Sequence, residues 1–447
     1  MIRDRGTWVR LIAAAAVCVL AFTGCQAVMP GAIGGDGPPG ATTVTGVGPG
    51  VTDDTVKVVF VAVSLAELGL FKTVPAGDPA RQVEALETWV NNNGGIAGRK
   101  LDAQLRVYDG ATDSPAAEEK LCNQVTQDDK AFAVVLTGQF QSNARPCYAQ
   151  RRTLAFDATL VANDQTTFGQ LAPYLWSPSY PGYDDFVKAF VATLSDQGFF
   201  AGARQVGIVA ADTPANRSAF DSYAKPGLAA LSVEPRVVWI DTTDLGTLNG
   251  GLNQAAVDFR TAGIDRVFFL GGARMASFFM TVAAAQSFTA RYGISSFDNP
   301  SFLINNPTTI PPSVLPGMVG VGFNPSQDVP DSQYAFPATD AERQCVEIFA
   351  AAGETFASRE NARVAFPYCD AVRLLQLAAR DLGPNLNAAA WSQAAAALGD
   401  RFVPATGFAG SLSAGRYAPA SAYRVLSYDT ACPCFRYLSE DVPFATR

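Results

Sequence analysis

The chain has 447 residues, of which 48% are hydrophobic and 17% are charged, so it is long enough for two or three domains with a large core. Its formal net charge of −8 argues against a nucleic-acid-binding surface. The sequence contains no histidine, which excludes Ser-His-Asp and Cys-His catalysis and histidine-based zinc motifs.

The N-terminus has the pattern of an export signal. Three arginines precede an apolar run from Leu11 to Phe22, which is long enough for a signal peptide but too short for a transmembrane helix. The run ends in Phe22-Thr23-Gly24-Cys25, which is similar to a bacterial lipoprotein processing site. We therefore expect a signal peptide over residues 1–24 and a lipid anchor at Cys25; ordinary cleavage nearby is the alternative.

Residues 25–50 are rich in glycine and proline, a composition that cannot pack a core and that predicts a flexible tether. Gly46, Gly48 and Gly50 look superficially like a dinucleotide-binding turn. They precede a strand candidate and do not open a helix, so we expect no cofactor there.

The cysteines predict disulfides. Setting aside Cys18 and Cys25 leaves an even number in an exported protein, which favours three bonds. Nearness along the chain favours the pairs Cys122–Cys147, Cys345–Cys369 and Cys432–Cys434. For the last pair, free thiols and a soft-metal site are the alternatives. Two sulfurs without any histidine make a poor zinc site, so we expect no metal.

Apolar strand candidates alternate with helical stretches in the first third of the chain. The clearest helix has Asp78 as its cap and Pro79 at its first position, and Gly94 and Gly95 end it. The strands expected here are Val56–Val63, Leu101–Tyr108, Ala131–Leu136 and Thr153–Phe156.

A second series follows a break at Trp176–Gly182. Its expected strands are Gln205–Ala211, Arg236–Asp241 and Arg266–Leu270, and its expected helices are Ala215–Leu231, Leu248–Ala262 and Ala273–Arg291. A second break lies at Gly322–Pro325. After it we expect a helical stretch at Ala338–Leu398 and strands at Ser421–Tyr428 and Cys434–Leu438. This alternation predicts an α/β fold with parallel sheets covered on both faces.

The segment Trp89–Lys100, followed by a strand that ends in Tyr108-Asp109, resembles the type I periplasmic solute-binding proteins of the branched-chain amino acid (Leu/Ile/Val) family. The resemblance implies a two-lobed fold in which each lobe is a parallel-sheet three-layer sandwich and hinge strands join the lobes. It also implies that lobe I comprises residues 51–178 and 325–405, and that lobe II comprises residues 179–324 and 406–447.

Ligands of doubly wound sheets lie beyond the carboxyl ends of the strands, so the loops there are the candidate site. The resemblance implies that a hydroxyl and backbone groups of lobe I hold a ligand carboxylate, at Gln141 or Ser142 and at Ala158 and Thr159. Helix capping is the alternative role for Ser142. The loop Ser64–Gly77, with Glu67, Phe71 and Lys72, is a further candidate wall of the cleft.

Lobe II departs from the family pattern. Members that bind amino acids have an aromatic residue at the position of Ala273 and another near Asn216. They have an acidic residue for the ligand amine where Asn305 follows an expected strand at Phe302–Ile304. The ammonium group of an amino acid ligand would have no carboxylate partner at this position. A standard branched-chain amino acid is therefore not expected. Arg274 would favour an anionic or carbonyl-bearing ligand if it faces the cleft; a surface arginine is the alternative.

The resemblance implies an extracytoplasmic substrate-binding lipoprotein of an ABC importer, which captures a small polar ligand (amino-acid-like, amide or carboxylate) between two closing lobes. We expect a monomer without enzymatic activity, held on the outer face of the cell membrane through Cys25, with an ABC permease as partner. The alternatives are a sensory or scaffold lipoprotein of the same fold and a secreted carboxylate-dependent hydrolase. Without histidine, ligand affinity should stay nearly flat from about pH 5.5 to about 8.

Overall fold

The computed structural model of the chain describes residues 45–64 and 74–444. The predicted signal peptide, Cys25, most of the tether, and Glu67, Phe71 and Lys72 lie outside these described residues. No helix within the described part is both long and apolar enough to cross a membrane. The end of the predicted tether is attached to the folded chain, because the amides of Gly46 and Gly48 donate to Asn385 Oδ1 and Leu386 O at 3.1 and 2.8 Å.

The strands of the described chain are β1 (Thr55–Ser64), β2 (Lys100–Asp109), β3 (Ala133–Leu136), β4 (Leu154–Asp157), β5 (Leu175–Trp176), β6 (Gln205–Ala211), β7 (Glu234–Ile240), β8 (Arg266–Leu270), β9 (Arg291–Ser295), β10 (Val319–Gly322), β11 (Ala422–Asp429), β12 (Cys434–Tyr437) and β13 (Val442–Pro443).

Its α-helices are α1 (Pro79–Asn92), α2 (Pro115–Asn123), α3 (Arg145–Gln150), α4 (Gln165–Leu171), α5 (Tyr183–Asp196), α6 (Pro214–Ala219), α7 (Lys225–Ala230), α8 (Leu245–Thr261), α9 (Ala273–Ala285), α10 (Pro300–Asn305), α11 (Pro325–Asp328), α12 (Asp340–Ala351), α13 (Ala365–Ala379) and α14 (Ala388–Ala396). Shorter 3-10 or π segments are η1 (Gly110–Thr112), η2 (Gln124–Asp128), η3 (Phe220–Ala224), η4 (Ser296–Asp298), η5 (Pro312–Val314), η6 (Arg359–Ala362) and η7 (Gly383–Asn385).

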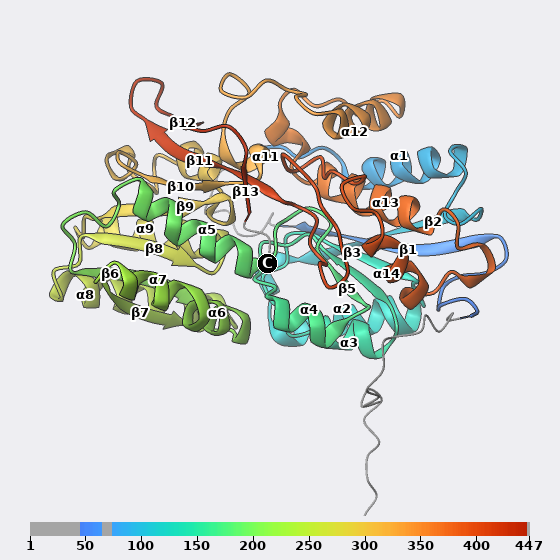
Figure 1. Cartoon of the computed structure of the whole chain (residues 1–447), viewed down its shortest axis with the longest axis horizontal. Helices are drawn as coiled ribbons and strands as arrows, with labels where there is room; N and C mark the ends of the chain where they lie inside the picture. The colour runs from blue at the N-terminus through green and yellow to red at the C-terminus, as the bar shows by residue number, and fades with distance from the viewer. Residues whose placement is uncertain (1–44, 65–73, 445–447) are drawn as a thin grey trace, which may run out of the picture. The chain divides into compact units, whose positions relative to one another are not determined.

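Two sheets organise these elements, and each has helices packed beside it (Figure 1). The first is parallel throughout, in the order β2-β1-β3-β4-β5. The second has the order β12-β11-β10-β9-β8-β6-β7, with β13 paired to β11. Its strands β6 to β10 are parallel, and β11 and β12 are antiparallel to their neighbours. We call the first sheet with its helices lobe I and the second lobe II.

Lobe I combines segments from both halves of the sequence. Leu86 and Val90 of α1 share one hydrophobic core with Phe366 and Leu374 of α13. Trp391 of α14 packs edge-on against the β5 residue Trp176, with ring centroids 5.0 Å apart. The helices after residue 338 therefore return to the first sheet, as the family resemblance implies. The exact residues at which the lobes divide stay a prediction.

The five parallel strands of lobe II repeat the strand order of lobe I. Counted from the first strand of each lobe, both sheets read 2-1-3-4-5, so the chain reverses its direction across the sheet between β1 and β3 and again between β6 and β8. At such a reversal, the two loops at the carboxyl ends of the strands diverge and leave a crevice. Both crevices are therefore candidate ligand positions.

Most predicted elements are confirmed, and β6 and β8 have the predicted bounds. The strand expected at Phe302–Ile304 is wrong. These residues belong to α10, which begins with Pro300 after the capping side chain of Asn299. The helix expected up to Arg291 ends at Ala285, because Ser287 turns the chain with a φ of 55° and β9 begins at Arg291.

The structure contains the three disulfides expected from nearness along the chain. Cys122–Cys147 joins α2 to α3, Cys345–Cys369 joins α12 to α13, and Cys432–Cys434 lies at the turn between β11 and β12. The first two connect neighbouring helices of lobe I.

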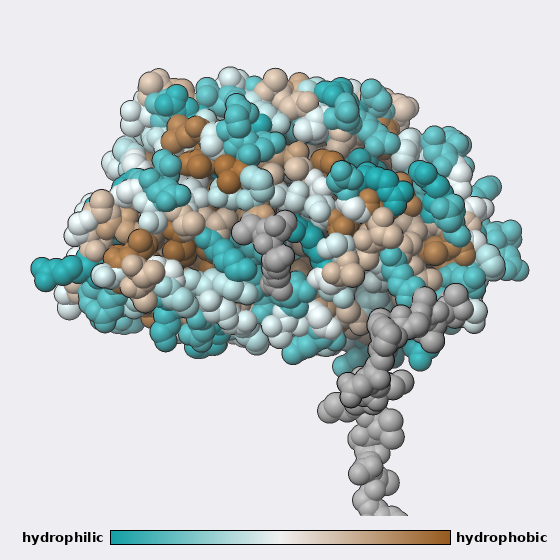
Figure 2. All heavy atoms as spheres, in the orientation of Figure 1, coloured by the Kyte–Doolittle hydropathy of each residue, from teal (hydrophilic) through white to brown (hydrophobic). Residues whose placement is uncertain are grey.

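Hydrophobic side chains are mainly internal. The face in Figure 2 mixes hydrophilic and hydrophobic residues. Within the described chain, the large hydrophobic side chains that are exposed lie singly on different segments, at Val47, Val107, Leu231, Val257 and Leu438.

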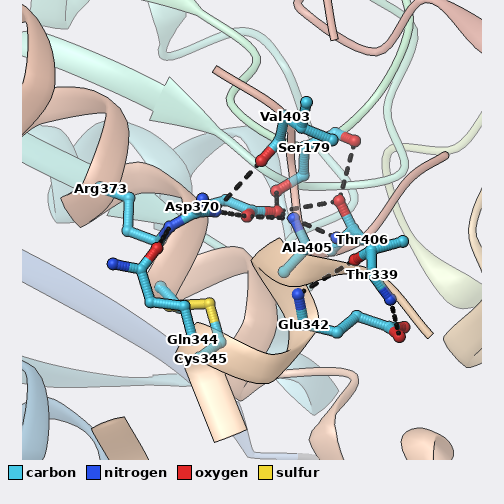
Figure 3. The surroundings of a disulfide bond; sticks show 11 residues. Ser179, Thr339, Glu342, Gln344, Cys345, Asp370, Arg373, Val403, Ala405 and Thr406 are labelled. Atoms are coloured by element: carbon cyan, nitrogen blue, oxygen red, sulfur yellow. Dashed lines mark hydrogen bonds and ion pairs between the residues drawn. A yellow bond between two sulfur atoms is a disulfide. The ribbon is translucent and has the colours of Figure 1, made fainter. Parts of the chain in front are cut away.

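One buried carboxylate joins the connections between the lobes (Figure 3). Asp370, on α13, has no solvent exposure and accepts hydrogen bonds from Ser179 Oγ at 3.1 Å and from the Ala405 amide at 2.6 Å. The Thr406 hydroxyl lies 2.9 Å from the same carboxylate, and Arg373 pairs with it at 3.4 Å. Ser179 lies between β5 and β6, and residues 405–406 lie between α14 and β11, so Asp370 fixes two crossings at once.

The third crossing, which follows β10, has a similar arrangement. Asp328 is buried and accepts from Ser296 Oγ at 2.9 Å, from the Asn324 amide at 3.1 Å and from the Tyr437 hydroxyl at 2.8 Å. Each of the three crossings thus contains a residue that is hydrogen-bonded to a buried aspartate, either Asp370 or Asp328.

The burial of Asp370 generates a pH prediction. Burial raises its pKa to about 6, although Arg373 and the hydrogen bonds oppose the rise. The folded chain therefore binds a proton on Asp370 more strongly than the unfolded chain does. The stabilisation of the fold by the protonated carboxyl is lost as the pH rises through about 6. Asp370→Asn should remove this part of the pH dependence, on the order of 1–3 kcal/mol between about pH 4 and about pH 7.

Urea unfolding at the two pH values would measure it, with the exposed Asp400→Asn as control. An unchanged difference in unfolding free energy between the two pH values in Asp370→Asn would contradict the assignment.

Candidate functional site

A pocket lies where the loops at the carboxyl ends of strands from both lobes meet. Its cavity volume is about 30 Å³, and the wider hollow around it, including the part open to solvent, is about 450 Å³. The loops after β3 and β4 contribute one side, and the ends of β6, β7 and β8 with the following helices contribute the other. Its lining residues are Phe140, Leu160, Val161, Ala162, Ala211, Thr213, Asn216, Thr242, Leu248, Gly271, Gly272 and Met275. The lining is mostly apolar, and none of these residues is ionisable.

Local structure fixes the lobe I wall. The Thr137 hydroxyl donates to Val61 O at 2.8 Å, which holds the end of β3 against β1. Gly138 has a φ of 79°, a conformation that glycine adopts without strain, and it turns the chain toward Phe140. The aromatic ring of Phe140 therefore reaches the pocket from a short, tightly held loop.

The lobe II wall is built by the start of α6. Thr213 caps the helix by accepting from the Asn216 amide at 3.2 Å, and Pro214 occupies the first turn. This places Asn216 one turn into the helix, where it lines the pocket. That Asn216 contacts a ligand stays a prediction.

The Asn216 side chain has one polar atom that is hydrogen-bonded and one that is not. Its side chain is only 2% exposed, and its Nδ2 donates to Thr213 Oγ1 at 3.0 Å. Its Oδ1 has no hydrogen-bond partner. Leaving a buried acceptor unpaired costs about 1–3 kcal/mol, so a ligand that donates to it would recover that free energy.

Gln141, predicted as a ligand contact, connects the two lobes directly. Its Nε2 donates to Asp113 Oδ2 at 3.0 Å in lobe I and to the Thr242 carbonyl at 2.8 Å in lobe II. Gln141 is not among the lining residues. The neighbouring Ser142 is partly buried, and its carbonyl accepts from the Arg145 amide at 3.2 Å.

The other predicted lobe I contacts have partners inside the protein. The Ala158 amide donates to Leu136 O at 2.9 Å. The Thr159 amide and hydroxyl both donate to Asp157 Oδ1, at 3.0 and 2.6 Å. A ligand carboxylate at this place would have to displace the carboxylate of Asp157.

Asp157 belongs to a buried ionic cluster that the sequence analysis missed. Arg145 is 1% exposed, and its guanidinium contacts Asp157 Oδ2 at 2.8 Å and Glu118 Oε2 at 3.3 Å. Asn163 Nδ2 donates to Asp157 Oδ2 at 2.9 Å. Burial raises the pKa of Glu118 to about 7, with Arg145 opposing the rise. Burial lowers the pKa of Arg145, but the two carboxylates more than compensate and raise it overall.

Of the remaining predicted residues, Asn305 does not line the pocket. The side chains of Ala273 and Arg274 lie outside the described residues, although α9 begins at Ala273. Asn305 ends α10 and donates from Nδ2 to Glu360 Oε1 at 3.0 Å. This bond ties α10 to η6, away from the pocket lining.

An acidic residue does follow a strand in this part of lobe II, because the strand lies before Phe302–Ile304, which belongs to α10. The strand is β9, and Asp298 follows it in η4. Its Oδ2 accepts from the Ser295 amide and hydroxyl at 2.7 and 2.9 Å. Burial raises the pKa of Asp298 to about 8. Asp298 caps its own turn and does not line the pocket.

The lobes also approach each other through backbone atoms. Gly272 has a φ of 83°, and a Cβ built on it would lie 2.5 Å from the carbonyl oxygen of Leu160. Only glycine allows the end of β8 to come this close to the loop after β4.

Comparison with solved structures places this geometry in a known fold. The structure is similar to a possible leucine/isoleucine/valine-binding protein from Rhodopirellula baltica SH 1, with a TM-score of 0.58 and 14% identity, covering 87% of this chain and 97% of that one. The chain has the type I periplasmic-binding-protein fold. No protein-family model and no curated protein sequence matches the chain.

Two further solved proteins with this fold differ in the ligands that their descriptions name. A solute-binding protein of an ABC transporter from Rhodopseudomonas palustris BisB5, in complex with 3,4-dihydroxybenzoic acid, has a TM-score of 0.60 and 14% identity over 88% of this chain and 98% of that chain. A fatty acid ABC transporter substrate-binding protein from Thermomonospora curvata has a TM-score of 0.59 and 16% identity over 89% and 95%.

The buried cluster gives a stability prediction. Arg145→Met should lower the unfolding free energy by about 3–5 kcal/mol, because it leaves the carboxylates of Glu118 and Asp157 buried without their cation. Urea unfolding at neutral pH measures the loss, and the exposed Arg204→Met serves as control. A variant within about 1 kcal/mol of the wild type would show that the cluster contributes little.

Proposed function

We propose that this protein is the substrate-binding component of an ABC importer outside the cytoplasm, and that it captures a small molecule between lobes I and II. The observation that carries the proposal is the pocket itself. It is built from carboxyl-end loops of both sheets, and on the lobe II side it lies at the reversal between β6 and β8, where doubly wound sheets bind ligands. A ligand that touches both walls would stabilise the closed arrangement over an open one.

The contacts between the lobes support closure as the working motion. Gln141 bonds to the Thr242 carbonyl across the lobes, and Gly272 lies against Leu160. These contacts lie at the pocket, whereas the crossings at Asp370 and Asp328 lie elsewhere on the chain. The pocket side can therefore open while the crossings stay connected.

The predicted delivery and anchoring complete the proposal. A signal peptide over residues 1–24 would export the chain, and lipid on Cys25 would hold it at the outer face of the cell membrane near its permease. The chain would act as a monomer without catalytic activity. A sensory lipoprotein with the same fold stays the second candidate. Carboxylate-dependent hydrolysis has no support in the described lining, which contains no carboxylate.

Ligand screening tests the proposal directly. We expect at least one small molecule, from a panel of amino acids, amides, ureas and aliphatic or aromatic carboxylates, to raise the melting temperature and to reduce the radius of gyration in small-angle scattering. Native mass spectrometry of the purified protein would add any copurified compound to the panel. Failure of every compound to change both quantities would contradict ligand capture.

Gly272→Ala tests closure separately. The added methyl group collides with the Leu160 carbonyl only when the lobes are together. We expect at least a tenfold loss of affinity for the ligand found in the screen and a weaker compaction on binding. Gly263→Ala is the matched control, because Gly263 also has a positive φ, 67°, but has open space at its Cβ position. Equal effects of the two substitutions would contradict closure at Gly272.

A further inference from the structure

The chemistry of the pocket walls narrows the class of ligand, if the proposed function holds. Nine of the twelve described lining residues are apolar or glycine, and the three polar ones, Thr213, Asn216 and Thr242, are neutral. A carboxylate or an ammonium group placed against such walls would lose its hydration without gaining a partner of opposite charge. That loss is larger than the gain from burying a small apolar body.

Two charged groups of the described chain that flank the α6 wall are paired with each other. Asp212 and Arg217, which flank the Thr213–Asn216 turn, form a two-point ion pair with each other at 2.6 and 2.9 Å. The Arg217 guanidinium also lies over the Trp239 ring, 4.3 Å from its centroid. Both side chains are about half exposed, so they face solvent and leave the α6 wall neutral.

The charged groups on the lobe I side have partners inside that lobe. The guanidinium of Arg145 is enclosed by Glu118 and Asp157. Asp113 accepts from Tyr108 and from Gln141, at 2.9 and 3.0 Å. None of these four charged residues is among the described lining residues of the pocket.

Asn216 has a hydrogen-bond acceptor that the described walls leave without a partner. Its Nδ2 is held by Thr213 Oγ1, which orients the amide and leaves Oδ1 as a buried acceptor without a partner. A ligand hydroxyl or amide N–H would fill this position. We propose that the ligand is a neutral small molecule with an apolar body and a hydrogen-bond donor, and that Asn216 is the residue that selects for the donor.

Matched compounds test the class. In two series the apolar body stays constant: benzamide, N,N-dimethylbenzamide, benzoate and benzylamine; and isovaleramide, N,N-dimethylisovaleramide, isovalerate and isoamylamine. By calorimetry, the best primary amide should bind at least tenfold more tightly than its dimethyl amide, its carboxylate and its amine. Tighter binding of a carboxylate or an amine would overturn the proposal, and so would the absence of binding by both primary amides.

Variants test the residue. Asn216→Leu should reduce the ratio of primary to dimethyl amide affinity from tenfold or more to less than threefold. A general loss of fold would lower both affinities and leave the ratio unchanged. Asn253→Leu, at an exposed position of α8 outside the lining, is the matched control and should keep the ratio. Arg274→Ala tests the competing residue and should also keep it. A ratio unchanged in Asn216→Leu, or one that depends on Arg274, would overturn the assignment.

The two proposals can fail separately. If a charged compound binds and compacts the protein, the neutral ligand class is wrong and ligand capture stands. If no compound of the wider screening panel binds or compacts the protein, ligand capture itself is wrong.

Discussion

The Asp370 carboxylate is the interaction on which the arrangement of the molecule depends. It has no exposure to solvent, and its hydrogen bonds reach the two crossings at Ser179 and at Ala405–Thr406. Burying a carboxylate is costly unless several donors surround it. Here backbone amides, hydroxyls and the Arg373 guanidinium supply those donors. Asp370 holds these two crossings together. The loops of the two sheets that meet at the pocket are therefore connected to a fixed point.

Several carboxylates of the described chain are buried, and burial raises their pKa. With no histidine in the chain, the groups that titrate near neutrality are the carboxyls whose pKa burial raises: Glu118 and Asp328 to about 7, Asp298 to about 8 and Asp370 to about 6. Each stabilises the fold less as the pH rises through its folded pKa. None of them lines the pocket. Stability should therefore depend on pH much more than affinity does.

Much of the fold could be predicted from the sequence, because long apolar strands and capped helices leave local signals. Gln205–Ala211 forms β6 over its whole predicted length. Short strands escaped detection. The β10 sequence Val-Gly-Val-Gly has low strand propensity, but Gly320 is required there because a Cβ would lie 1.8 Å from Ile294 O. The β9 strand, Arg291–Ser295, was not predicted, and its first residue was included in the preceding helix.

The candidate site was less predictable, because it depends on contacts between distant segments. Asn216 lines the pocket, as its position after β6 suggests. Gln141 instead bonds to Thr242, a residue of the other lobe, and no local pattern reports such a contact. The pairing of Arg145 with Asp157 could have been suspected, since an arginine follows the β3 loop and an aspartate ends β4. The burial of the two side chains could not be predicted from the sequence, because it arises from packing between distant segments.

The central claim is that a small neutral molecule is held between the two lobes. The most direct measurement is a crystal structure of the protein with the compound that raises its melting temperature most. The account predicts electron density for that compound in contact with both Phe140 and Asn216, with a donor group within hydrogen-bond distance of Asn216 Oδ1. Density in contact with a single lobe, or a charged group against the apolar walls, would contradict it.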